Sequence, residues 1–257
     1  MFNKFLAKIG IGSAEIDTVL EQTHYTPGDE VRGEIRLRGG SVEQQIETIA
    51  LSVMTEYIKE SNDNKYHQRA EIARIHVTPP FLLQAGEGRE IPFSFRLPAR
   101  TPLTLGRTPV WIRTELEIQG AVDPSDNDRI EVYPSAEMRT VLDGVEEAGF
   151  RFRKAECEYT AHLGGGLPFL QEFEFTPTGR FRGRLDEVEI MFVGQDEGGI
   201  DLLLQIDRRA RGLSSLFAEA FDMDESFVRL RLSSGELAGG PHAVAGTLSG
   251  IIERYAK

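Results

Sequence analysis

Apolar and polar residues alternate along most of the chain, a pattern that is typical of half-buried β-strands. The alternation is clearest in residues 25–40, YTPGDEVRGEIRLRGG. Pro27 and Gly28 predict a type II turn, because proline presets φ at its first central position and glycine accepts the positive φ at the second. In the strand that follows, one face carries Val31, Gly33, Ile35 and Leu37 and the other carries Arg32, Glu34, Arg36 and Arg38. This division predicts an antiparallel strand with one buried face.

The same period of two recurs in short segments throughout the chain, separated by glycine, proline or polar runs. In the first half we expect strands at residues 14–21, 49–53, 73–77, 91–97, 110–118 and 130–133. In the second half we expect strands at residues 150–159, 188–192, 200–206 and 227–232. Acidic residues of the first strand should face the arginines of the strand described above. Many short strands with such spacing predict β-sandwiches.

A hairpin is also predicted in the second half, between EFEF at residues 172–175 and RFRGRL at residues 180–185. A loop of Pro177, Thr178 and Gly179 would join the two strands. This register would pair Glu174 with Arg182 and Glu172 with Arg184, and would set Phe175 against Phe181.

Four segments have helical spacing of their apolar residues or a high content of helix formers. They are residues 1–10, the connector 136–149, residues 208–225 and the C-terminal residues 244–255. Residues 122–127 and 235–240 are predicted loops. Pro134 ends the last strand of the first half, so we expect two domains, residues 1–134 with the N-terminal helix and residues 135–257 with the inserted and C-terminal helices.

Composition and charge restrict the class of function. The 257 residues carry a formal net charge of -12, which makes binding to a phosphate backbone unlikely to be favourable. A single cysteine, Cys157, excludes an intrachain disulfide and a cysteine-based metal cage. No apolar run has the length of a signal peptide core or a membrane span. We therefore expect a cytoplasmic protein that does not bind nucleic acid.

Catalytic and cofactor motifs are missing from the sequence. The start of a glycine motif at Gly10 and Gly12 has Glu15 at the position of the third glycine, and neither a GxSxG nor a GxxxxGK[ST] motif occurs. The five histidines are scattered and form no zinc motif. Asp123, Asp126 and Asp128 offer closely spaced oxygens for a hard cation, but the loop lacks the glycine and the distal glutamate of an EF-hand, which favours a polar strand connection. We expect no catalytic residue, no metal and no cofactor.

Two segments are candidate interaction sites. The first combines a basic cluster with an apolar stripe, and its residues are Arg208, Arg209, Arg211, Leu213, Leu216 and Phe217. It would bind a protein partner, although an apolar stripe of this kind is more often part of a core than of an interface. The second is an N-terminal membrane or partner anchor made of Phe2, Phe5, Leu6 and Ile9, which would otherwise pack on the protein itself. A third basic group, Arg180, Arg182 and Arg184, would either bind an acidic partner or pair with the glutamates of the predicted hairpin.

Several motifs together resemble a known family. YTPGDEVRGEIRL, EIPFSFRLP and WIRTELEI in the first half resemble arrestin-like N-domains. With VEQQIETIALSVMTEY, EFEFTPTGRFRGRLDEVEIMF and IDRRARGL added, nearly the whole chain is similar to the bacterial sporulation-control protein family called SpoOM.

This resemblance implies an all-β protein of two tandem arrestin-like, immunoglobulin-like β-sandwiches with short peripheral helices. It further implies a non-enzymatic cytoplasmic scaffold that binds protein partners in sporulation or cell-division control and that self-associates, as a homodimer for example. By analogy with arrestins, Arg113, Asp126 and Asp128 are candidates for a charge network between the domains. Two alternatives are a peripheral membrane-surface adaptor with weak membrane association, and a hydrolase or ligand-binding sandwich with carboxylates in an interdomain cleft.

Overall fold

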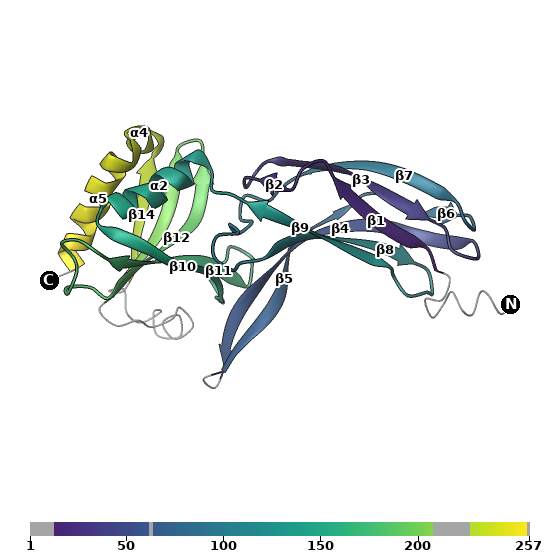
Figure 1. Cartoon of the computed structure of the whole chain (residues 1–257), viewed down its shortest axis with the longest axis horizontal. Coiled ribbons are helices and arrows are strands. Elements are labelled where there is room, and N and C mark those ends of the chain that lie inside the picture. Colours follow the sequence, from purple (N-terminus) through teal and green to yellow (C-terminus); the bar gives the residue numbers. More distant parts are fainter. Residues whose placement is uncertain (1–12, 62–63, 208–226, 256–257) are drawn as a thin grey trace. The chain divides into compact units, whose positions relative to one another are not determined.

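A computed structural model describes residues 13–61, 64–207 and 227–255, and strands make up most of it (Figure 1). The chain divides into two compact units. Unit 1 contains Met1–Thr55, Glu71–Thr101 and Pro109–Tyr133, and unit 2 contains Glu56–Ala70, Pro102–Thr108 and Pro134–Lys257. The predicted first domain contains all residues before 135, whereas unit 2 also includes Glu56–Ala70 and Pro102–Thr108. The dominance of strands over a few short helices confirms the predicted fold class.

Unit 1 is built from two sheets. Its strands are β1 (Glu15–Leu20), β2 (His24–Tyr25), β3 (Glu30–Arg38), β6 (Phe81–Leu83), β7 (Gly88–Arg96), β8 (Val110–Ile118) and β9 (Ser125–Val132), with parts of β4 (Gln44–Ser61) and β5 (Asn64–His76). One sheet has the order β1-β3-β7, and the other contains β4-β8-β9-β2 with β6 on β4. The hydroxyls of Thr18 on β1 and Thr114 on β8 lie 2.6 Å apart and join the two sheets.

The turn and strand predicted from residues 25–40 are confirmed. Gly28 has φ +93, and Val31 and Ile35 are fully buried on the inner face of β3. The register of β1 and β3 sets Asp17 opposite Arg36. The closest acid to Arg36, however, is Glu34 on the same strand, at 3.0 Å. Such exposed pairs contribute little to stability, so the inner face fixes this strand.

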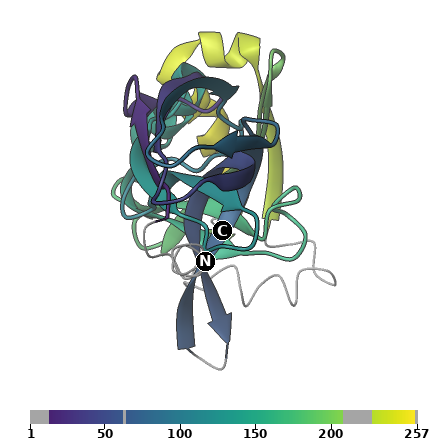
Figure 2. The ribbon, with the colours of Figure 1, turned by 90° about the vertical axis from the view of Figure 1, so that its right-hand side faces the viewer.

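The hairpin of β4 and β5 passes from unit 1 into unit 2, and its distal part, Glu56–Ala70, belongs to unit 2. The side chains of β5 are exposed at residues 64–69. Both views show the two strands projecting together (Figures 1 and 2), and near the start of this part β4 pairs with β10 at Ile58. Among the strands that the structure describes, β5 pairs with β4 alone.

Unit 2 contains a five-stranded antiparallel array with the order β14-β13-β12-β11-β10. Its strands are β10 (Phe150–Tyr159), β11 (Phe169–Pro177), β12 (Glu187–Asp196), β13 (Gly199–Asp207) and β14 (Phe227–Ser233). Its helices are α2 (Ala136–Glu147), α4 (Ser234–Ala238) and α5 (Gly240–Tyr255), and they cover one face of the array (Figure 1). Phe173, Phe175, Ile190 and Leu204 are among the buried core residues of this unit.

The predicted hairpin of residues 172–185 is wrong. β11 pairs with β10 and β12, and residues 180–185 form turns with one isolated bridge between Arg182 and Leu185. Gly183 has φ +80, which interrupts an extended chain at that point. Arg184 forms an ion pair with Glu253 of α5 at 2.8 Å and not with Glu172. The ring of Phe181 stacks on Phe150, with centroids 5.2 Å apart.

The helix predictions are partly confirmed. The connector helix is α2, whose first turn is capped by the Ser135 hydroxyl, which accepts a hydrogen bond from the backbone of Met138 at 3.1 Å. The C-terminal helix is α5. A loop was predicted at residues 235–240, but Ser233 and Glu236 form a capping box that starts the short α4 there. The predicted N-terminal helix and the helix at 208–225 lie outside the described residues.

One predicted loop of the first half is also corrected. Residues 122–127 were expected to be a loop, but β9 begins at Ser125 and includes Asp126. The backbone of Thr18 donates a hydrogen bond to the Asp126 carboxylate at 2.8 Å. Because this polar side chain meets a strand backbone, a polar composition does not prevent an extended conformation here.

Helices α2 and α5 meet at a glycine. A Cβ atom at Gly144 would lie 2.8 Å from Cγ1 and 2.9 Å from Cβ of Val244, and 3.1 Å from the carbonyl oxygen of Pro241. Val244 is fully buried and β-branched, so it has little freedom to move aside. Gly144 therefore sets how closely the two helices approach.

We predict opposite effects for alanine at two helical glycines. Gly246→Ala on the exposed side of α5 meets no atom within 4 Å and should stabilise the protein by about 1 kcal/mol, through helix propensity. Gly144→Ala should destabilise it by about 1–3 kcal/mol, because overpacking outweighs that propensity. Urea denaturation measures both free energies of unfolding. An equal gain in stability from both variants would contradict the packing of α2 on α5.

Candidate functional site

Unit 2 buries a row of glutamates on the face of its sheet that lies opposite the phenylalanines. Side chains alternate along a strand, so Glu172 and Glu174 of β11 point to one face and Phe173 and Phe175 to the other. The register places Glu174 directly opposite Glu189 of β12. Glu187 lies two residues before Glu189 and shares its face. All four glutamates are at most 6% exposed.

Apolar side chains continue this face beyond the glutamates and help to exclude water from it. Leu170, Met191 and Leu203 form a buried cluster. Leu163, Val193 and Phe227 are partly buried against it. The carboxylates therefore border an apolar region, and burial penalises their charged forms.

Two basic residues reach the row from β10 through a β-bulge at Arg153. The register of β10 and β11 sets Phe152 opposite Phe175 and Lys154 opposite Glu174, which leaves Arg153 as the extra residue. The Arg153 guanidinium contacts Glu174 closely and lies 3.2 Å from Glu187. The Lys154 ammonium lies 2.8 Å from Glu156 and 3.3 Å from Glu174. The bulge thus directs two consecutive basic residues to one carboxylate.

The glutamates differ in their affinity for protons. Burial, the hydrogen bond with Glu174 and the charge of Glu174 raise the pKa of Glu187 to about 7. Burial and the charges of Glu187 and Glu158 raise the pKa of Glu189 to about 8. Burial and the charges of Glu158 and Glu189 raise the pKa of Glu172 well above its usual value.

Glu174 behaves differently from its neighbours. Burial acts to raise its pKa, but the hydrogen bond from Glu187 and the charges of Lys154 and Arg153 outweigh this and lower it. Glu174 is consequently the ionised member of the row, and Glu187 holds the proton of their shared hydrogen bond.

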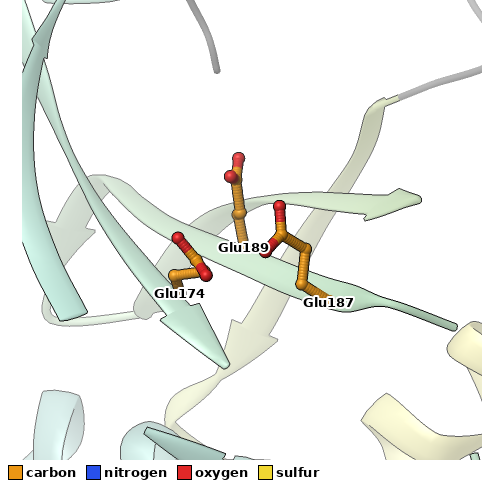
Figure 3. Close-up of side chains that lie close together, drawn as sticks. All are labelled: Glu174, Glu187 and Glu189. Carbon is orange, nitrogen blue, oxygen red and sulfur yellow. The ribbon is translucent and has the colours of Figure 1, made fainter. Parts of the chain in front are cut away.

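Three of these carboxylates converge. Glu174, Glu187 and Glu189 each offer one oxygen, and these oxygens all lie within 4.8 Å of one another. Figure 3 shows the three side chains on the same side of β11 and β12. We call Glu174, Glu187 and Glu189 the carboxylate cluster. The arrangement has the chemistry of proton sharing or of binding a hard cation.

The sequence contains a pattern that could have indicated this cluster, but the pattern was interpreted as part of a hairpin. EFEF and EVEI place glutamates at alternate positions of two strands. The predicted hairpin assigned Glu172 and Glu174 to arginines of residues 180–185, so the glutamates looked neutralised. Their true neighbour, β12, lies further along the chain.

Most residues predicted to form sites are not brought together. The partner-binding candidates Arg208, Arg209, Arg211, Leu213, Leu216 and Phe217 lie outside the described residues, as do the anchor candidates Phe2, Phe5, Leu6 and Ile9. Arg113, Asp126 and Asp128 all lie in unit 1. The role of these three residues between the domains stays a prediction.

Arg113 does not join the two aspartates. The register sets Asp126 opposite Thr114 and Asp128 opposite Ile112, so both aspartates share a face from which Arg113 points away. Arg113 instead forms an ion pair with Glu115 at 2.7 Å. Burial and the neighbouring Asp126 raise the pKa of Asp128 to about 6.

Other candidate chemistry is accounted for by local structure. Asp123 accepts a hydrogen bond from the backbone of Ile118 at 2.8 Å, so it serves the connection between β8 and β9. Cys157 is buried, and burial raises the pKa of its thiol. The thiol therefore stays protonated and unreactive. Among the described helices, none has the length and apolar character needed to cross a membrane.

The fold and the site together define a class of protein, a mostly-β chain of two compact units with an acidic face buried in the second. The family model described as SpoOM protein matches residues 2–210. The sporulation-control protein Spo0M of Bacillus subtilis (strain 168) is 40% identical over 257 residues, which is 100% of this chain and 99% of that protein. The chain belongs to the SpoOM family.

A solved structure extends the similarity to three dimensions. The crystal structure of Spo0M from Bacillus subtilis matches with a TM-score of 0.89 and 40% identity, over 95% of this chain and 100% of that one. This match confirms the predicted arrestin-like fold and the family resemblance.

We predict that the carboxylate cluster makes the protein less stable as pH rises. In the unfolded chain Glu189 has a pKa of about 4.5, whereas in the folded protein it is about 8. The folded state therefore binds more protons between these values, and the free energy of unfolding falls as pH increases from about 5 to 8. Glu187 adds to the same trend up to about pH 7.

Glu189→Gln should remove much of this pH dependence. The fall in the free energy of unfolding between pH 5 and pH 8 should be smaller than in the wild type by on the order of 2 kcal/mol. Urea denaturation in metal-free buffer at several pH values measures it. Glu146→Gln, at an exposed position of α2, is the matched control and should keep the wild-type dependence. The prediction fails if Glu189→Gln and wild type show the same change of stability with pH.

Proposed function

We propose that this protein is a non-enzymatic regulator that acts in the control of sporulation or cell division by binding other proteins. The observation that carries the proposal is the 40% identity to the sporulation-control protein Spo0M over the whole length of both chains. Identity of this extent covers both units, so the proposed role belongs to the complete two-unit protein. We further propose that it acts in the cytoplasm and as a scaffold for its partners.

The distal part of the β4/β5 hairpin supports the interaction component of this proposal. Among the described strands β5 pairs with β4 alone, so its other edge is open. Tyr66 on this edge strand is 51% exposed. Open strand edges bind partner chains by adding a strand, and an exposed tyrosine is a frequent contact residue.

Complementation in Bacillus subtilis tests the proposed function. A strain that lacks its own Spo0M would express this chain at a matched protein level, and heat-resistant spores would be counted. We expect the count to return to that of the parent strain. A strain that accumulates the folded protein and still sporulates like the strain without Spo0M would contradict the proposal.

The predicted partner site is testable in the same strain. Reversing the charge of Arg208, Arg209 and Arg211 to glutamate should lower complementation, because an acidic partner surface would then repel the protein. We expect at least a tenfold loss of the restored spore count. Arg139→Glu, at an exposed position of α2, is the control and should complement fully. Full activity of the triple variant at equal protein level would remove these arginines from the partner site.

A further inference from the structure

The carboxylate cluster has the spacing of a cation site. Glu174 lies on β11, Glu187 and Glu189 lie on β12, and one oxygen from each is within 4.8 Å of the other two (Figure 3). Calcium binds oxygens at 2.3–2.6 Å, so two oxygens on opposite sides of one ion are about 4.6–5.2 Å apart. The three oxygens are therefore close enough together to contact a single ion.

Two buried carboxylate oxygens on the face of the carboxylate cluster lack a hydrogen-bond donor among the described residues. Oε2 of Glu189 and Oε1 of Glu172 have no hydrogen-bond partner within the part of the chain that the structure describes. The two residues are 4% and 6% exposed. Buried polar atoms without partners are rare, because each costs the free energy of its lost hydration. A cation beside these two oxygens would supply the partner that each of them lacks in the described part of the chain.

Glu172 lies on the same face of the sheet as the cluster. It precedes Glu174 by two residues on β11, so its side chain lies on the same face. Glu174 is opposite Glu189, which makes Glu172 a diagonal neighbour of Glu189 across the strand pair. The unpartnered oxygen of Glu172 is thus independent of the three oxygens that converge, and it offers a further oxygen ligand on the same face.

The basic residues of β10 form ion pairs with only some of the glutamates on this face. Arg153 pairs with Glu174 and Glu187, and Lys154 pairs with Glu156 and Glu174. The ion pairs formed by these two residues do not include Glu172 or Glu189. The Arg153 side chain is 54% exposed, so it is free to turn towards solvent when a stronger cation takes its place.

We propose that Glu174, Glu187 and Glu189 bind a hard divalent cation, for which Ca²⁺ is the best fit, and that this ion links β11 to β12. The donor atoms are all carboxylate oxygens, and the cluster contains neither histidine nor cysteine. Softer metals prefer nitrogen and sulfur ligands, so the donor set favours a hard cation. Mg²⁺ requires a near-ideal octahedron with oxygens at 2.0–2.1 Å and usually keeps several waters, so three buried protein carboxylates suit the more adaptable coordination of Ca²⁺ better.

The proposal is tested on the full chain after treatment with a chelator and exchange into metal-free buffer. Calorimetric titration with CaCl₂, MgCl₂ and MnCl₂, each alone, measures binding, and thermal unfolding measures its effect. We expect saturable binding of one ion. At a free Ca²⁺ concentration of about one hundred times Kd, we expect Tm to rise by about 5 °C.

Two variants separate this site from other acidic groups. Glu189→Gln and Glu187→Gln keep the size of the side chain and should each weaken binding at least tenfold. Asp126→Asn on β9 removes an acidic side chain of unit 1 and should bind the ion as wild type does. Circular dichroism confirms that each variant is folded before titration.

The possible outcomes decide the question. Binding of any of the three ions that both glutamine variants weaken and Asp126→Asn leaves intact supports the proposal. No binding to the wild-type chain at millimolar metal overturns it, even if a variant fails to fold. Binding that survives in both glutamine variants also overturns it, because the ion would then lie elsewhere.

Discussion

Strands β11 and β12 of unit 2 bury side chains on both faces over most of their length, and this constraint shapes the whole unit. On β11 the phenylalanines enter an apolar core, whereas Glu172 and Glu174 enter a polar one. Burial of carboxylates is costly unless charges, protons or hydrogen bonds compensate. The chain supplies a β-bulge that directs Arg153 and Lys154 to Glu174, and a proton held between Glu174 and Glu187. This compensation leaves oxygens of Glu172 and Glu189 without partners among the described residues.

The same constraint fixes the register of the strands. A shift of β11 by one residue would move the glutamates beneath the helices and the phenylalanines onto the polar face. A single register therefore pairs Glu174 with Glu189 and Phe173 with Ile190. It buries the core under α2 and α5 and gathers the carboxylates at the same time.

The sequence predicted the local structure well, because local structure depends on neighbouring residues. Alternation located residues 110–118 and 150–159, the bounds of β8 and β10. Serine and glutamate spacing could have located α4, but the surrounding glycines favoured a loop. The structure of residues 180–185, which were predicted as the second strand of a hairpin, was harder to predict. RFRGRL alternates like a strand, yet Gly183 with its positive φ interrupts it, and β12 provides a more apolar partner for β11.

The candidate site could not be predicted, because it depends on which strands are neighbours. EFEF and EVEI each look like ordinary half-buried strands, with glutamates facing water. Only the pairing of β11 with β12 brings Glu174, Glu187 and Glu189 together, and only burial of the second face removes them from solvent. The assignment of the chain to its family, by contrast, depended on the order of motifs along the sequence and required no knowledge of strand pairing.

We propose that the buried carboxylates of unit 2 surround a cation. A crystal structure of the full chain grown with Mn²⁺ in place of Ca²⁺, recorded at a wavelength where manganese scatters anomalously, tests it most directly. We expect an anomalous peak between Glu174, Glu187 and Glu189, with Arg153 turned away from Glu187. A map without a peak there, in which Arg153 still bridges Glu174 and Glu187, would contradict it.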